Sequence, residues 1–192
     1  MDEVLELYRL GLIRFGEFKL SSGKKSTFYI NLRDLPSFPD LFEKIMNMAI
    51  EKIDPTSFDF VCGIATGGIP LAAYIAFKLR MPFGYVRIEK KTHGIEGYVA
   101  GRTEGRRILL VDDVTTTGAS LLRSTNILEP SGGKLSCILV IVVRNLNVVD
   151  LFKKRGVRFA YLYYAGDIID YLFNQGLITK NMYDVATSEL KK

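Results

Sequence analysis

The apolar run CILVIVV at residues 137–143 limits, more than any other feature, what this chain can fold into. A strand without a polar residue on either face has to be covered on both sides, which is typical of a parallel sheet between two layers of helices. Further strand patterns occur at residues 58–64, 83–87, 107–111 and 158–163. Helical patterns occur at residues 69–80, 118–129 and 147–155, and two more follow residue 166. This alternation predicts an α/β fold whose parallel sheet is flanked by helices on both faces.

The amino-terminal part of the chain follows a different pattern. Residues 2–10 have helical spacing, and the segment FKLSSGKKSTFYINLR is typical of a hairpin that turns around Ser22 and Gly23. Residues 39–53 are predicted to form a helix that begins at Pro39, because proline is favoured in a first helical turn. The chain has 192 residues, 48% of them hydrophobic, and no linker or repeat, so we expect one domain.

Composition narrows the classes of protein to which the chain can belong. No run of about 18 apolar residues is present, and the segment MDEVLELYRL is acidic and amphipathic. We therefore expect a cytoplasmic protein with neither a membrane span nor a secretory signal. Cys62 and Cys137 lie inside apolar runs and are expected to be core thiols. His93 is the single histidine, so any catalytic histidine has to be this one.

The positive charge of the chain is concentrated in one stretch. A net charge of +5 and a pI near 9.1 suit nucleic acid, a membrane surface or small anions. Cationic side chains gather between Arg87 and Arg107, which favours one local anionic site over a long groove. Residues 88–104 form an irregular segment with three glycines, and a segment longer than about 12 residues is usually functional. We expect this segment to be a lid that closes over the site.

The segment RILLVDDVTTTGAS, residues 107–120, carries the chemistry of that site. Two adjacent carboxylates, Asp112 and Asp113, follow a buried strand, and small hydroxyl residues lead into the next helix. Backbone amides at such a helix start favour a phosphate, which predicts a phosphate site at residues 115–120. The carboxylates can accept hydrogen bonds from sugar hydroxyls or hold a metal ion through water. A ribose 5-phosphate satisfies both halves, whereas an ordinary helix cap by Asp113 or a threonine is the alternative.

The segment ILLVDDVTTTGAS resembles the phosphoribosyl diphosphate signature of the type I phosphoribosyltransferases. Two further segments, FKLSSGKKSTFYINLR and VRIEKKTHGIEGYVAG, resemble the hairpin and the basic catalytic loop of the orotate phosphoribosyltransferases. Together with CGIATGGIPLA and VVRN, the resemblance covers residues 15 to about 145. It implies the type I phosphoribosyltransferase fold, in which residues 1–35 form a small helix and hairpin hood over the active site of a single domain spanning residues 1–192.

The resemblance also implies a reaction. Orotate phosphoribosyltransferases join orotate to phosphoribosyl diphosphate and give orotidine 5′-phosphate and diphosphate, in the biosynthesis of UMP. Mg²⁺ is the implied cofactor, held mainly through substrate oxygens and water, so no metal ligand from the protein is expected. Departure of diphosphate leaves an oxocarbenium-like ring, so the enzyme has to neutralise the leaving group and exclude water.

Site residues follow from the same resemblance, position by position. The implied catalytic residues are Lys91, His93, Asp112 and Asp113. Ribose 5-phosphate is expected on the two aspartates and on Val114, Thr115, Thr116, Thr117, Gly118, Ala119 and Ser120. Diphosphate is expected on Thr66, Gly67, Gly68, Arg87, Lys91 and His93. Orotate is expected to contact Tyr29, Ile30, Thr116 and Arg144, whose guanidinium fork can bind both oxygens of a carboxylate.

The chain departs from the family pattern at three positions. Many members have lysine where this chain has Ser21, Gly67 and Ile88, and Lys24, Lys25 or Lys90 could supply the missing charge. The resemblance further implies a homodimer in which the lid of one subunit reaches the active site of the other. A long cationic loop on one small domain has little to close against by itself.

Two other functions remain open from the sequence. The first is transfer to another base, such as a purine or uracil, because the phosphate loop is common to the superfamily; the hairpin and Arg144 argue against it. The second is a non-catalytic regulator that senses phosphoribosyl diphosphate and binds nucleic acid, which the basic pI would suit. Lys91 and His93 would serve no purpose in a sensor, and no helix-turn-helix pattern precedes the domain. Small-molecule substrates are therefore the expected partners, rather than nucleic acid or a membrane.

Overall fold

The computed structural model of the protein describes residues 1–19, 25–88 and 98–190. Its centre is a six-stranded sheet with the order β5-β4-β3-β6-β7-β8. The strands are β3 (Phe60–Ile64), β4 (Phe83–Val86), β5 (Val99–Ala100), β6 (Arg107–Thr115), β7 (Lys134–Val143) and β8 (Arg158–Tyr164). Neighbouring strands are parallel, except that the short β5 runs antiparallel to β4. The predicted parallel sheet is confirmed.

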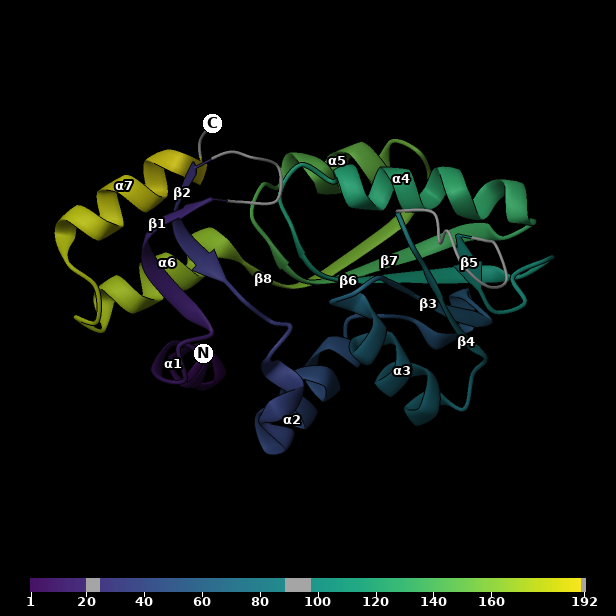
Figure 1. Ribbon diagram of the computed structural model, residues 1–192, viewed down its shortest axis with the longest axis horizontal. Coiled ribbons are helices and arrows are strands. Elements are labelled where there is room, and N and C mark those ends of the chain that lie inside the picture. The colour runs from purple at the N-terminus through teal and green to yellow at the C-terminus, as the bar shows by residue number, and fades with distance from the viewer. Residues whose placement is uncertain (20–24, 89–97, 191–192) are drawn as a thin grey trace.

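Helices cover both faces of this sheet (Figure 1). Helices α4 (Ala119–Leu128) and α5 (Asn147–Lys153) lie on one face, and α2 (Pro39–Ile50) and α3 (Gly68–Leu79) lie on the other. Side chains of β6 alternate between the two layers: Ile108 and Leu110 pack with α4 and α5, whereas Leu109 and Val111 pack with α2 and α3. The strands are apolar on both faces because each face is buried under helices.

The two ends of the chain pack together beside the sheet. Helix α1 (Asp2–Arg9) precedes an antiparallel pair of strands, β1 (Ile13–Lys19) and β2 (Lys25–Ile30), which form a separate two-stranded sheet. After β8 come α6 (Ala165–Asn174) and α7 (Lys180–Leu190), and α7 lies next to the β1-β2 pair (Figure 1). The predicted pairing of the two hairpin strands is confirmed, and the predicted turn at Ser22 and Gly23 lies outside the described residues.

The structure differs from the sequence prediction at several element boundaries. Strand β6 does not end at residue 111 but continues through the two acids, because it keeps pairing with β7 up to Thr115↔Val143. The expected irregular segment 88–104 contains the short strand β5, whose pairing with β4 no local pattern revealed. Three 3₁₀ helices were also not predicted: η1 (Leu35–Ser37), η2 (Pro55–Ser57) and η3 (Glu129–Ser131).

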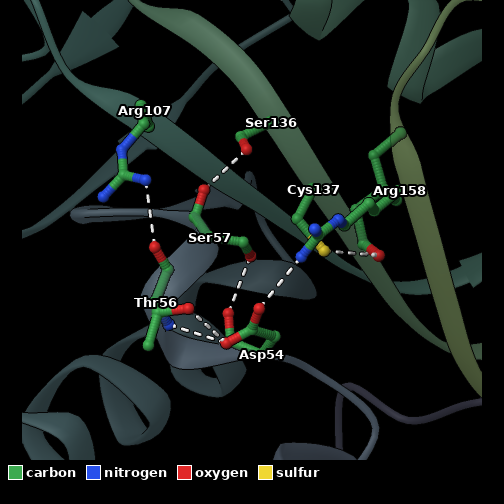
Figure 2. Close-up of polar contacts among 8 residues, drawn as sticks. Asp54, Thr56, Ser57, Arg107, Ser136, Cys137 and Arg158 are labelled. Atoms are coloured by element: carbon green, nitrogen blue, oxygen red, sulfur yellow. Dashed lines mark hydrogen bonds and ion pairs between the residues drawn. The ribbon is translucent and has the colours of Figure 1, made fainter.

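The amino-terminal ends of three parallel strands are tied to the η2 turn (Figure 2). Arg107 on β6 donates to the Thr56 carbonyl at 3.0 Å, and Ser136 on β7 donates to the Ser57 carbonyl at 2.6 Å. Arg158 on β8 forms an ion pair with Asp54 at 3.0 Å. These contacts fix the edge of the sheet opposite to the carboxyl ends of the strands, where ligands bind in such folds.

Both cysteines are buried free thiols, as predicted. Burial raises the pKa of Cys62 to about 12 and that of Cys137 to about 11, so both thiols remain protonated at neutral pH and are unreactive. Within the described residues, no helix has the length and apolar character that crossing a bilayer requires.

Candidate active site

The acid pair lies at the point where the order of the strands reverses. Strand β3 pairs with β6 only as far as Gly63↔Val111, so Asp112 lies level with the last residue of β3 and Asp113 extends beyond it. The chain continues from β3 to β4 on one side, and from β6 to β7 and β8 on the other. In open α/β sheets, ligands bind in the crevice at this point.

The loop that follows β3 lies directly against the acid pair. A Cβ atom on Gly67 would overlap the carboxylate of Asp113, and a Cβ atom on Gly68 would overlap the carbonyl oxygen of Val111. Both glycines are buried, whereas Thr66 before them is exposed. The glycines were predicted to let the loop approach ligand oxygens; in the structure they let it approach oxygens of β6. The predicted diphosphate loop and the acid pair therefore form one continuous surface.

Asp112 has an unusual electrostatic environment. Its side chain is 5% exposed, and its Oδ1 accepts a hydrogen bond from the Asp113 amide at 3.0 Å. Burial raises the pKa of Asp112 well above its ordinary value, and the neighbouring negative charge of Asp113 raises it further, with Arg33 opposing the shift. Two adjacent negative charges are thus disfavoured at the end of β6 until a cation or hydrogen-bond donors arrive.

The segment after β6 forms an open turn at the start of α4. Gly118 adopts a left-handed conformation with φ of 74°, and a Cβ atom there would overlap Val148 on α5. Thr116, Thr117 and Ala119 are exposed, and no side chain in the described part of the chain caps the start of α4. The helix-cap alternative is therefore wrong, and the first amides of α4 are free of a side-chain cap.

Arg87 is placed beside the predicted diphosphate loop by the pairing of β3 with β4. The Ala65 amide donates to the Val86 carbonyl at 2.9 Å, which aligns the ends of the two strands. The Arg87 side chain donates to the Tyr85 hydroxyl at 3.1 Å, and its guanidinium lies 5.2 Å from the centre of that ring. The amide of Arg87 donates to the Tyr98 carbonyl at 2.7 Å.

Arg144 follows β7 and connects the phosphate loop to the amino-terminal hairpin. Its amide donates to the Thr115 carbonyl at 2.8 Å, and its guanidinium lies 4.1 Å from the centre of the Phe28 ring. Its Nη2 donates to Ser26 Oγ at 2.9 Å and to Glu189 Oε1 at 2.6 Å. Nε is buried and has no hydrogen-bond partner among the described residues. The side chain is 5% exposed, so a buried donor remains for a ligand at this corner.

The two hairpin residues predicted to contact orotate do not both lie beside Arg144. Successive residues of a strand point to opposite faces, and the inward face of β2 carries Phe28 and Ile30. Ile30 is 7% exposed and belongs to the hydrophobic core. Tyr29 points to the other face and stacks on Phe18 with the ring centres 5.5 Å apart. The structure therefore brings Phe28, rather than Tyr29, to the guanidinium of Arg144.

Sequence reasoning missed the neighbours of Arg144 and could not place the lid. Glu189 lies 45 residues beyond Arg144, in a segment that no motif covers. The one available signal is general: a buried arginine needs a carboxylate partner, but several acids follow it in the sequence. The lid residues Lys91 and His93 lie outside the described residues.

The acid pair offers oxygen ligands of the kind that Mg²⁺ prefers. In the described part of the chain, no group of three or more histidine, cysteine, aspartate or glutamate side chains is arranged to hold a metal ion. Asp113 nevertheless places its carboxylate oxygens beside the loop of Gly67 and is half-buried, and Asp112 adjoins it in β6. Such a pair suits a hydrated Mg²⁺ that takes its other ligands from substrate oxygens.

Comparisons with known proteins agree with this geometry. Residues 31–155 match a family model described as the phosphoribosyl transferase domain. Over 181 residues the chain is 40% identical to orotate phosphoribosyltransferase of Sulfurisphaera tokodaii, with 94% of this chain and 93% of that protein covered. It is 38% identical, also over 181 residues, to orotate phosphoribosyltransferase of Sulfolobus acidocaldarius, with coverage of 94% and 92%. The crystal structure of orotate phosphoribosyltransferase from Aeropyrum pernix superimposes with a TM-score of 0.76 at 33% identity, covering 88% of this chain and 97% of that one.

Proposed function

The chain belongs to the orotate phosphoribosyltransferases, a family of pentosyltransferases, and from that membership we propose how its site carries out the reaction. The enzyme transfers the 5-phosphoribosyl group from phosphoribosyl diphosphate to orotate, giving orotidine 5′-phosphate and diphosphate in pyrimidine biosynthesis. The expected family and the expected fold are both confirmed.

The ribose 5-phosphate half of the substrate occupies the end of β6 and the start of α4. The 5-phosphate accepts hydrogen bonds from the uncapped amides at residues 116–120, because the amino terminus of a helix carries a partial positive charge. The left-handed Gly118 shapes this turn, and the Thr116 and Thr117 hydroxyls supply further donors. The ribose hydroxyls then face Asp112 and Asp113.

The diphosphate half occupies the loop after β3. The amides of residues 66–68 and the Arg87 guanidinium donate to its oxygens, and Lys91 and His93 add charge from the lid. Asp112 and Asp113 are the residues that would hold Mg²⁺, through water. Bound there, Mg²⁺ supplies neutralisation of the charge that builds on the departing diphosphate oxygen.

The transfer step requires orientation and exclusion of water more than a strong base. As the bond to diphosphate breaks, positive charge develops on the ribose ring, and the carboxylates stabilise it. The ring nitrogen of orotate is already acidic, so His93 acts as a donor to diphosphate rather than as a general base. Closure of the predicted lid, which carries Lys91 and His93, would prevent capture of the ring by water. Val99 and Ala100 within the expected range 88–104 are held in the sheet as β5 and form the base of that lid.

One observation carries the choice of orotate as the base. The buried guanidinium of Arg144 lies at the end of β7, next to the phosphate loop through its hydrogen bond to Thr115. Its Nε is buried without a partner among the described residues, and an unpaired buried donor is expected to have a ligand. A carboxylate is the natural acceptor for a guanidinium, and orotate carries one where uracil and the purines do not.

The direct test is a spectroscopic assay of substrate consumption. Protein, Mg²⁺, phosphoribosyl diphosphate and orotate are mixed, and orotate absorbance is followed. We expect a loss of orotate that depends on Mg²⁺, and no turnover when hypoxanthine, guanine or uracil replaces orotate. Turnover of one of these bases at a comparable rate would reassign the substrate, and binding of phosphoribosyl diphosphate without any turnover would favour a regulator.

We further propose that the enzyme works in the cytoplasm as a homodimer, with residues 1–35 as a hood over the site and the lid of each subunit closing the site of the other. Chains carrying Lys91→Ala lack the lid charge, and chains carrying both Asp112→Asn and Asp113→Asn lack the acid pair. Random exchange of equal amounts should return about a quarter of the wild-type activity, because half of the dimers are mixed and each contains one intact site. If the subunits exchange and activity does not return, the lid acts on its own chain.

A further inference from the structure

A carboxylate from the carboxyl-terminal helix binds the side chain that we assign to orotate recognition. Glu189 on α7 receives four hydrogen bonds from β2 and the end of β7. Its Oε1 lies 2.6 Å from Arg144 Nη2 and 2.7 Å from Ser26 Oγ. Its Oε2 accepts from the Thr27 amide at 2.7 Å and from the Thr27 hydroxyl at 2.8 Å. Both carboxylate oxygens are therefore occupied by donors of the protein.

These contacts restrain one half of the Arg144 guanidinium. Nη2 is held by Glu189 and Ser26, and the face of the guanidinium rests on the Phe28 ring. Nε, which shares an edge of the planar group with Nη2, is buried and has no partner among the described residues. A guanidinium is planar and rigid, so fixing Nη2 and one face also fixes the direction in which Nε donates.

Glu189 and Arg144 carry opposite charges, and the Arg144 side chain is buried. Burial alone raises the pKa of Glu189, but the hydrogen bonds from Ser26 and Thr27 and the charge of Arg144 outweigh it and bring the pKa below its usual value. Burial lowers the pKa of Arg144, and Glu189 opposes that shift. Glu189 is thus ionised at neutral pH and compensates a cation that would otherwise be buried alone.

We propose that Glu189 is a positioning residue for the transfer reaction. Through its contacts with Arg144, Ser26 and Thr27, it orients the Arg144 guanidinium so that the Nε–H points at the carboxylate of the base. This inference rests on the proposed contact between Arg144 and orotate. It assigns a functional role to helix α7, which no sequence motif covers. It also predicts the direction in which the KM for orotate changes. Removing a positioning carboxylate raises that KM, whereas removing a carboxylate that competed with orotate for Arg144 would lower it.

Glu189→Gln tests the proposal, because glutamine keeps the size and an acceptor oxygen but removes the charge. We expect the KM for orotate to rise by about 10- to 100-fold, the usual cost of losing a partner that orients a ligand-binding group. The KM for phosphoribosyl diphosphate and kcat should change less than threefold, because the phosphate sites lie on other elements. The matched control is Asp184→Asn on the same helix, which loses the exposed ion pair with Lys180 and should match the wild type.

A double-mutant cycle separates this proposal from the proposed function. If Arg144→Ala leaves the KM for orotate unchanged, the assignment of Arg144 to orotate is wrong. If Arg144→Ala raises that KM but Glu189→Gln leaves it unchanged or lowers it, only the role of Glu189 is overturned. In the Arg144→Ala background, adding Glu189→Gln should change the KM for orotate less than twofold, because Glu189 acts through Arg144. A further rise of tenfold would mean that Glu189 acts independently.

A second, milder variant tests the proposal if Glu189→Gln destabilises the protein. Thr27→Val removes one of the four hydrogen bonds of Glu189 and keeps the backbone donor. If Glu189→Gln melts early, Thr27→Val should still raise the KM for orotate by about threefold, the effect of losing one hydrogen bond, with a melting temperature close to that of the wild type. An unchanged KM in a folded Thr27→Val protein would overturn the proposal.

Discussion

Asp112→Asn is expected to lower turnover by about 100- to 1000-fold and, at the same time, to make the protein more stable at neutral pH. The loss of turnover is the typical cost of removing one charged group that stabilises a transition state. The gain in stability follows from burial, because asparagine keeps the shape and an acceptor for the Asp113 amide without placing a second charge beside Asp113. We expect a gain on the order of 1 kcal/mol, which corresponds to about 2 to 4 °C in melting temperature for a chain of this size.

The pH dependence of this gain has a definite sign. The folded protein raises the pKa of Asp112, so above the unfolded pKa near 3.8 it retains a proton that the unfolded chain has released. Stability therefore falls as the pH rises from about 4 through the folded pKa, and Asp112→Asn removes this loss. The difference in melting temperature between variant and wild type should grow from pH 4 to pH 8, as measured by calorimetry.

The surface variant Asp184→Asn provides the reference for this comparison, because it makes the same chemical change at an exposed carboxylate. A destabilised Asp112→Asn protein would mean that the negative charge of Asp112 contributes to the fold. Retained turnover would instead remove Asp112 from the catalytic residues.

Arg144→Ala should weaken binding of orotate by about 2 to 5 kcal/mol, the usual cost of stripping one partner from a buried charge pair. This corresponds to about 30-fold to several thousandfold in affinity. Binding of phosphoribosyl diphosphate should be nearly intact, because its proposed contacts lie on the loops after β3 and β6. The two affinities can be measured separately by titration calorimetry.

Arg144→Lys refines this experiment. Lysine keeps the charge but lacks the planar fork that meets Glu189 and a substrate carboxylate together, so its affinity for orotate should lie between those of the wild type and Arg144→Ala. Melting temperatures identify any general damage, since removing Arg144 also leaves Glu189 without its cation. An equal loss of affinity for both substrates would contradict a specific role in binding the base.

The central sheet could be predicted from the sequence because its signal is local. Runs such as CILVIVV have to be buried on both faces, and the alternation with helices leaves few arrangements for the strands. The extension of β6 through Asp112 and Asp113 could not be predicted in the same way. Polar residues usually end a strand, and here the pairing with β7 outweighs that preference.

The partners of Arg144 could not be predicted from local sequence patterns. The sequence points to Arg144 itself, because it directly follows a buried strand. Its partners come from β2 and α7, and Ser26 and Glu189 are 163 residues apart. The packing of Phe28 against Arg144 could not be predicted, because the face of a hairpin strand depends on register, and a shift of one residue exchanges the two faces.

The position of Glu189 also sets an order of events for the nascent chain. The central sheet lies between β3 and β8, and both phosphate loops lie between β3 and β7, so they are synthesised before α7 exists. Synthesis proceeds from the amino terminus, so every residue of both phosphate loops has been made while Arg144 still lacks its carboxylate partner. The contact that orients Arg144 is therefore the last part of the site to be completed, after both loops that we assign to phosphoribosyl diphosphate.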